Sequence, residues 1–313
     1  MLHLRVISPD DLTPQVESVL HAERGVANVV VLRAVAQAPA GDLVLADVAR
    51  EAANGIIGRL MDLGVPDRGA IALQPVDTML SAAADRAEHE APGHGQDAVV
   101  WEQVEETTSE ESTLSWSYLA FLTIATLIAG VGVLLDEPIL IVGAMVVGPE
   151  FGPLAGLCVA VVQRRYDVMR RSLKALLIGF PVAIGICGLV TLLARATGFV
   201  TVQMIDRSRP FTAFISHPDK FSFVVAVLAG AAGVLSLTSA KSSALIGVTI
   251  SVTTVPAAGN AAVALALDNP GGAGGSALQL SINLAGIVLA GTLTLLVQKA
   301  AWRRTDTDSG RYS

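Results

Sequence analysis

The pattern of apolar and polar residues divides the chain into two parts that meet near residue 112. In the first part, short apolar stretches alternate with polar ones, and most acidic residues of the chain are found there. From Leu114 to Val297 the chain consists of long apolar runs separated by short polar loops. A helix needs about 20 apolar residues to cross the hydrocarbon core of a bilayer. Residues 113–299 are therefore predicted to form a polytopic α-helical membrane domain.

The spacing of apolar residues in the N-terminal part predicts a small α+β domain. Leu2, Leu4 and Val6 alternate with polar neighbours, as in a half-buried strand. Apolar spacing predicts helices over residues 10–22 and 50–63 and strands over residues 28–35, 42–48 and 70–76. The resulting βαββαβ order predicts a ferredoxin-like domain, residues 1–80. Such folds serve ligand sensing as well as dimerisation, so a regulatory and a structural role both stay open.

Residues 81–112 are acidic and are expected to form a linker that ends in a short helix near residues 101–111. His89 and His94 lie among acidic residues, a composition that could suggest a metal site. The surrounding stretch, which contains APGHGQD, offers no rigid frame for ligands. We therefore expect a solvated linker here and no metal site.

Six membrane spans are predicted, over residues 114–135, 138–163, 172–194, 222–238, 242–267 and 276–298. The loop after the second span, RRYDVMRRSLK, is short and basic, so it is expected on the cytoplasmic side. With six spans, the N-terminal domain and the tail, residues 300–313, lie in the cytoplasm as well. Basic residues in the loop 195–221 conflict with this topology, although the loop also contains two aspartates. The N-terminus has no signal-peptide pattern, so the first span is expected to direct the chain to the cytoplasmic membrane.

Spans two and five contain helix breakers. PILIVGAMVVGPEFGPLAGLCVAVVQ has Pro149 and Pro153 near its middle, and SSALIGVTISVTTVPAAGNAAVALAL has Pro256. Because proline lacks a backbone donor and clashes with the preceding turn, both spans are predicted to be broken helices. Such breaks persist only where they are buried in protein or line a wet cavity. If both segments cross fully, the two halves of the domain are inverted three-helix repeats, an arrangement typical of transporters. If both are re-entrant, that relation disappears.

Glu150 is the one acidic residue far from a predicted membrane edge. An ionisable group at that depth is costly and indicates a functional site. A carboxylate in the first turn of a half-helix also complements the helix dipole, which is a purely structural alternative. If the breaks meet, the predicted site for a solute or ion comprises Gly148, Pro149, Glu150, Gly152, Pro153, Thr254, Pro256, Gly259 and Asn260.

Asn283 of span six is also predicted as a site residue. It lies four residues after Gln279, so the two side chains share a helix face. Hydrogen bonding between helices also explains that pair without a ligand. Half-helix N-termini favour an anion, whereas Glu150 favours a cation or a proton. The sequence leaves the sign of the solute open.

Composition narrows the remaining classes of function. The formal net charge of -7 argues against nucleic acid as a partner. The spans contain no histidine and no HExxH motif, and neither cysteine lies beside an evident base. Nucleophilic and metal catalysis both lack their parts, so we expect neither an enzyme nor a cofactor.

Several segments resemble a known family. WEQVEE, LSWSYLAFLTIATLIAGVGVL, IVGAMVVGPEFGPLAGL, VPAAG and SINLAGIVLAG are similar to the prokaryotic uncharacterised hydrophobic domain family, domain of unknown function 389 (DUF389). Within its most specific motif, GAMVVGPEFGP, Gly148 and Glu150 depart from the family's preference for apolar residues beside the first proline. Val255 stands where relatives often have the first of two prolines. The resemblance implies a membrane fold and supplies no established activity.

The leading hypothesis is a transporter or channel of the cytoplasmic membrane, with a cytosolic regulatory domain and a site at the two broken helices. The alternative is a membrane-anchored sensor of small molecules, or an oligomeric scaffold, without transport. Membrane lipid, a small solute or ion and further copies of the same chain are the expected partners. Glycine-rich helix faces support the expectation of a homo-oligomer.

Overall fold

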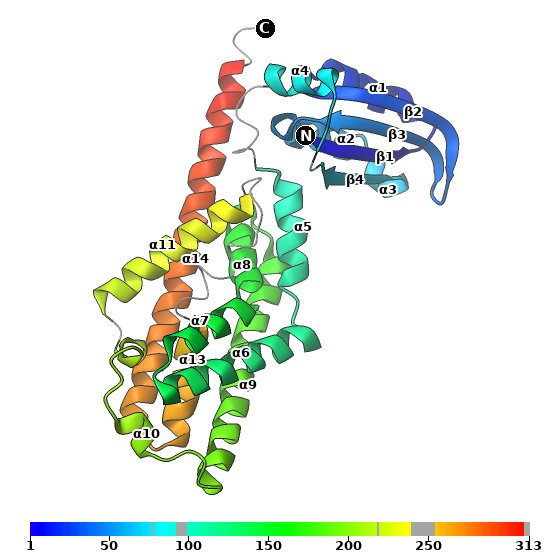
Figure 1. Ribbon diagram of the computed structural model, residues 1–313. Helices are drawn as coiled ribbons and strands as arrows, with labels where there is room; N and C mark the ends of the chain where they lie inside the picture. Colours follow the sequence, from blue (N-terminus) through cyan, green and yellow to red (C-terminus); the bar gives the residue numbers. More distant parts are fainter. Residues whose placement is uncertain (77, 92–98, 218, 239–253, 310–313) are drawn as a thin grey trace. The chain divides into compact units, whose positions relative to one another are not determined.

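The computed structural model describes residues 1–76, 78–91, 99–217, 219–238 and 254–309 (Figure 1). The chain forms two compact units. Met1–Val104 makes up most of the first unit, and Glu105–Leu237 with Ser242–Ala301 makes up the second.

The first unit is built around one four-stranded antiparallel sheet with the strand order β2-β3-β1-β4. Its elements are β1 (Leu2–Ser8), α1 (Thr13–Ala22), β2 (Val26–Gln37), β3 (Ala40–Val48), α2 (Arg50–Asp62), α3 (Val65–Arg68) and β4 (Ala70–Pro75). This is the βαββαβ order expected from the sequence, with α3 as an addition. Helix α2 ends near the predicted position, because Gly64 adopts a left-handed φ of 74°.

The alternation of apolar and polar residues along β1 directs its apolar side chains into the core of this unit. Leu2, Leu4 and Val6 are buried and form one cluster with the apolar faces of α1 and α2. The largest fully buried side chains that these helices contribute are Leu20, Ile56 and Leu60. Burial of such side chains stabilises the fold by about 1.5–3 kcal/mol each.

The segment expected to be a solvated linker contains two helices, α4 (Ala82–Glu90) and α5 (Trp101–Glu111). Ala84 and Ala87 of α4 are buried against Ala27 of β2. The apolar face of α4 consists of alanines alone, so hydrophobicity gave little indication of it. Helix α5 corresponds to the short acidic helix that the sequence predicts. His94 lies outside the described residues.

The second unit is helical throughout its described part. Its elements are α6 (Trp116–Leu135), α7 (Pro138–Val147), α8 (Phe151–Gln163), α9 (Tyr166–Ala196), α10 (Gln203–Asp206), η1 (Ala213–Ser216), α11 (Lys220–Thr238), α13 (Thr254–Ala266) and α14 (Pro270–Ser309).

Four described helices, α6, α9, α11 and the part of α14 up to Ala301, are long and apolar enough to cross a membrane. The bent pair α7 and α8 makes a fifth if it is counted as one span. These helices indicate a membrane protein. The predicted span 242–267 is described only from residue 254, so the six spans and the inverted repeat stay predictions.

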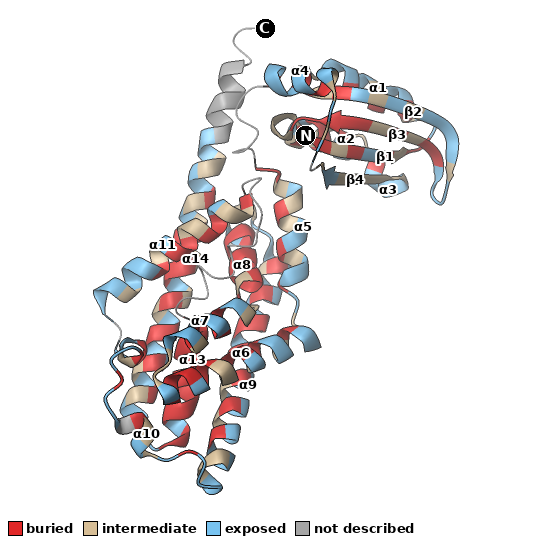
Figure 2. Ribbon diagram, viewed as in Figure 1, coloured by how far each residue is buried: buried red, intermediate tan, exposed pale blue. Residues whose placement is uncertain are grey.

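Helix α13 forms the centre of this unit. Twelve of its thirteen residues are buried (Figure 2), and it packs against α6, α7 and α9. The described part of this helix is about 20 Å long, at about 1.5 Å per residue. A Cβ on Gly259 would lie 2.8 Å from Ala129 Cβ and 2.9 Å from the Gly130 nitrogen, so glycine permits the close approach of α13 to α6.

Candidate functional site

The helix break predicted in span two is present between α7 and α8, whose axes differ by 55°. Gly148 follows the last residue of α7 with an extended backbone, φ -65° and ψ 127°. That conformation is the one that a following proline imposes on its neighbour, here Pro149. Pro153 lies in the first turn of α8, where a missing N–H leaves no helical hydrogen bond unmade. Proline thus ends one helix and is tolerated in the next.

Glu150 occupies the position just before α8, where its carbonyl oxygen accepts the Leu154 N–H at 3.2 Å. Its side chain makes no capping hydrogen bond to α8. The carboxylate instead folds back over Gly148, where a Cβ would overlap it and would lie 2.9 Å from Cγ2 of Val255. Gly148 is therefore required by the conformation of Glu150, and Val255 of α13 closes the same space.

The carboxylate of Glu150 accepts a hydrogen bond from the Thr254 hydroxyl, with 2.7 Å between Oγ1 and Oε1. Both residues are completely buried, and they are 104 positions apart in the chain. A hydrogen bond to a charged group is worth about 1.5–3 kcal/mol. This bond joins the α7–α8 break to the first residue of α13.

Tyr118 of α6 is a buried polar residue of the same apolar core, and the sequence did not single it out. Its hydroxyl packs over Gly179 of α9 and has no hydrogen-bond partner among the described residues. An apolar span with one tyrosine near its start is usually explained by the membrane interface, where tyrosine is common. Only the packing of α6 against α9 places this hydroxyl in the interior.

Asn260 belongs to a second polar network, also anchored on α13. Its side-chain oxygen accepts from Nη1 of Arg209 at 3.0 Å, and its amide donates to Oγ of Ser276 at 2.6 Å. Oγ of Ser276 in turn donates to the Ile215 carbonyl at 3.4 Å. Arg209 and Ser276 were not predicted as site residues. The arginines of the loop 195–221, which conflict with the positive-inside rule, were the available signal.

Pro149 is half-buried, and the other predicted residues are buried but have separate neighbours. Gly152 packs against Glu111, and Pro256 lies in the first turn of α13. Asn283 accepts from Nε2 of Gln279 at 3.3 Å, as their shared helix face predicted. The structure thus brings together Gly148, Glu150 and Thr254, and it assigns Asn260 to a different network. Thr253 lies outside the described residues.

The chemistry of the Glu150 site is that of oxygen groups in an apolar surrounding. A carboxylate and a hydroxyl meet between the α7–α8 break and α13, beside an apolar core that also contains Tyr118 of α6. Such oxygens can hold a proton or a hard cation, or can order water. Across the residues that the structure describes, no group of three or more His, Cys, Asp or Glu is arranged to hold a metal ion.

Comparison with known proteins confirms the resemblance drawn from the sequence. Residues 145–289 match the family model described as Domain of unknown function (DUF389), and this range contains both the α7–α8 break and α13. Uncharacterized protein MJ0678 of Methanocaldococcus jannaschii is 24% identical over 169 residues, which cover 54% of this chain and 50% of the relative. The chain thus aligns with about half the length of this curated relative. No solved structure matches the chain.

Proposed function

We propose that the protein moves a small solute or ion across the cytoplasmic membrane, as a transporter or channel, by way of the α7–α8 break and the start of α13. One observation supports this most: the buried carboxylate of Glu150 is bonded to Thr254 of a half-length helix. Ionisable groups at this depth mark ion and proton pathways, and broken helices form the sites of many transporters.

The proposed architecture has six spans arranged as inverted three-helix repeats. Helices α6, α7–α8 and α9 form the first repeat, and α11, residues 242–267 and α14 form the second. In this scheme α13 is the second half of the broken span five and corresponds to α8. The basic loop after α8 places both termini in the cytoplasm. The N-terminal unit then acts as a cytosolic regulatory domain. The partners of the whole protein are membrane lipid and further copies of the same chain.

The groups at the break favour a positively charged solute. Glu150 contributes an acidic oxygen, and Thr254 contributes a hydroxyl. Oxygen donors of this kind suit a proton or a hard metal cation better than an anion. A proton would be exchanged at Glu150 itself, and a cation would replace the hydrogen of Thr254 as the partner of the carboxylate.

The test is flux through the purified full-length protein in liposomes, measured for H⁺, Na⁺ and K⁺ with dyes enclosed in the vesicles. Glu150→Gln keeps the size of the side chain and removes its charge and its proton exchange. We expect flux to fall by at least about tenfold, equivalent to about 1.4 kcal/mol in the barrier. Glu137→Gln, at the partly exposed start of α7, is the matched control and is expected to leave flux within about twofold. Equal flux in folded Glu150→Gln would remove Glu150 from the mechanism.

The alternative function is a sensor or scaffold without transport. The first unit has its own sheet and its own core, which favours a domain that binds a small molecule independently of the break. In that case a metabolite would raise the thermal stability of the full-length protein equally in wild type and in Glu150→Gln, and no flux would be found.

A further inference from the structure

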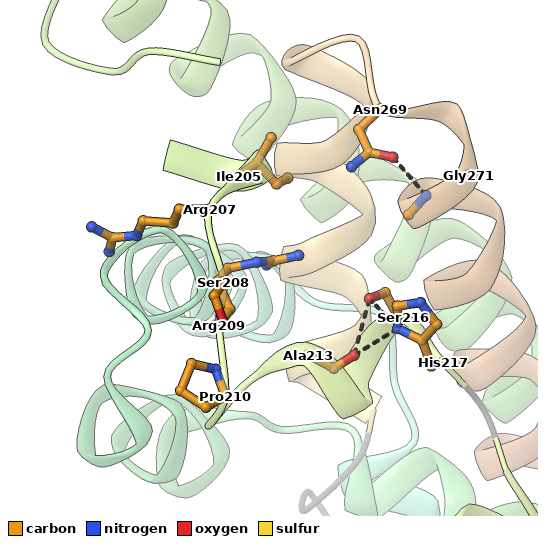
Figure 3. A pocket seen from close by; sticks show the side chains of 11 residues that line it. Ile205, Arg207, Ser208, Arg209, Pro210, Ala213, Ser216, His217, Asn269 and Gly271 are labelled. Carbon is orange, nitrogen blue, oxygen red and sulfur yellow. Dashed lines mark hydrogen bonds between the residues drawn. The ribbon is translucent and has the colours of Figure 1, made fainter. Parts of the chain in front are cut away.

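The second unit contains a cavity of about 560 Å³ between two segments, residues 205–217 and residues 269–272. Figure 3 shows the side chains around it. Arg209 extends toward the side on which Asn269 and His217 lie, whereas Arg207 points away from them. The first segment is the loop before α11, and the second contains the start of α14. The cavity is separate from the Glu150 site.

The lining of this cavity includes the charged guanidinium of Arg209, which extends toward Asn269 and His217. Arg207 borders the cavity as well, but its guanidinium points away. None of the described residues that line it is an Asp or a Glu. The nearest acid along the second segment, Asp268, is paired with Arg195, with 2.7 Å between Oδ2 and Nη1.

The start of α14 adds to the positive electrostatic potential in the cavity. Oδ1 of Asn269 accepts the Gly272 N–H at 2.8 Å, so Asn269 is the N-cap of this long helix. Gly271 and Gly272 line the cavity, and the first backbone N–H groups of a helix carry its positive dipole end. Without side chains at these two positions, a ligand can approach the backbone closely.

The cationic groups are held in place by bonds to three helices. Arg209 is only 8% exposed and donates to Asn260, which fixes its guanidinium against α13. Arg207 donates from Nη2 to the Leu134 carbonyl at 2.7 Å, at the end of α6. Nδ1 of His217 lies 3.0 Å from the Ala213 carbonyl and 3.1 Å from Oγ of Ser216, which holds the ring at the cavity. The site is preorganised, so little ordering is needed when a ligand binds.

We infer that this cavity binds a phosphate group, carried either by soluble phosphate or by the headgroup of an anionic lipid. Arginine, an amide and the N-terminus of a helix are the groups that recognise phosphate oxygens in proteins. The inference does not depend on the proposed transport, because it rests on other residues and on a ligand of the opposite charge.

The decisive variant is Asn269→Asp. Aspartate caps a helix as well as asparagine does, so the fold is retained, but a negative charge now lies at the cavity. Titration calorimetry of the full-length protein with inorganic phosphate, in neutral detergent at constant ionic strength, is expected to show affinity weakened by at least about tenfold. Ser115→Asp is the control, because Ser115 caps α6 in the same way, at 3.0 Å from the Tyr118 nitrogen, and is exposed. It adds the same charge and is expected to leave phosphate binding unchanged.

A second arm identifies the source of the phosphate. The same proteins are placed in nanodiscs of phosphatidylcholine with and without phosphatidylglycerol, and thermal unfolding is compared. If the headgroup is the ligand, phosphatidylglycerol raises the melting temperature of wild type and of Ser115→Asp but not of Asn269→Asp, while inorganic phosphate gives no heat. If soluble phosphate is the ligand, only the first arm responds.

The inference is overturned if wild type responds to neither ligand, if Asn269→Asp responds as wild type does, or if Ser115→Asp loses binding equally. His217→Ala, at an exposed ring, is a second variant for the case that Asn269→Asp does not fold. It removes one polar side chain from the lining and is expected to weaken binding by at least about threefold. Unchanged binding in folded His217→Ala would contradict the inference in that case.

Discussion

The hydrogen bond between Thr254 and Glu150 predicts a specific loss of stability in Thr254→Val. Valine has the size and shape of threonine, so the substitution leaves no cavity and removes only the hydroxyl. In the structure this hydroxyl is fully buried and donates to Oε1 of Glu150 at 2.7 Å. Its loss deprives a buried acidic group of a donor, which costs about 1.5–3 kcal/mol of unfolding free energy. For a protein of this size the melting temperature is then expected to fall by about 2–5 °C.

Thr126→Val provides the matched control. Thr126 is also completely buried, but its hydroxyl donates to the Leu122 carbonyl of its own helix at 2.7 Å. Helical bonding still satisfies that carbonyl when the hydroxyl is removed, so the change is expected to stay within about 0.5 kcal/mol. Both variants carry the same substitution, at equal burial and at similar helix propensity.

The assay is thermal unfolding of the purified full-length proteins in one detergent, followed by tryptophan fluorescence. Thr254→Val is also measured in the Glu150→Gln background, where the acceptor is neutral. If the hydroxyl acts through Glu150, its removal costs at least about 1 kcal/mol less in that background than in wild type. A Thr254→Val protein as stable as Thr126→Val, or an equal cost in both backgrounds, would refute the structural account of this bond.

Two further predictions concern other parts of the fold. Gly259→Ala is expected to lower the unfolding free energy by about 1–3 kcal/mol, because the new Cβ would lie 2.8 Å from Ala129 Cβ. A Cβ at Gly143 would meet nothing within 4 Å, so Gly143→Ala is expected to be neutral or stabilising in the same unfolding assay. The pKa of Asp42 is lowered by hydrogen bonds from the Ala34 N–H and the Arg33 guanidinium. The ionised form of Asp42 therefore stabilises the fold at neutral pH, and this contribution is lost as the pH falls through the lowered pKa. Asp42→Asn is therefore expected to be less stable than wild type at pH 7, and the difference should narrow below about pH 4; a constant difference from pH 7 to pH 3 would contradict the assignment.

The elements that the sequence predicted correctly depend on neighbours along the chain. The alternation of Leu2, Leu4 and Val6 indicates a strand with one buried face, and the structure buries all three. Pro149 breaks span two because a proline acts on its own turn and on the residue before it. Helix α4 was missed because alanines bury little surface, and its packing on β2 was not evident from its composition.

The sequence by itself determined most of the helices and strands and the place where span two breaks, because these properties follow from local periodicity and local backbone chemistry. Only the tertiary structure decided that Glu150 bonds to Thr254, that Tyr118 lies in the interior and that Asn260 bonds to Arg209 instead. These partners lie up to 104 residues apart. Which polar groups meet across such distances depends on how helices pack and rotate against one another, and no pattern within a single helix contains that information.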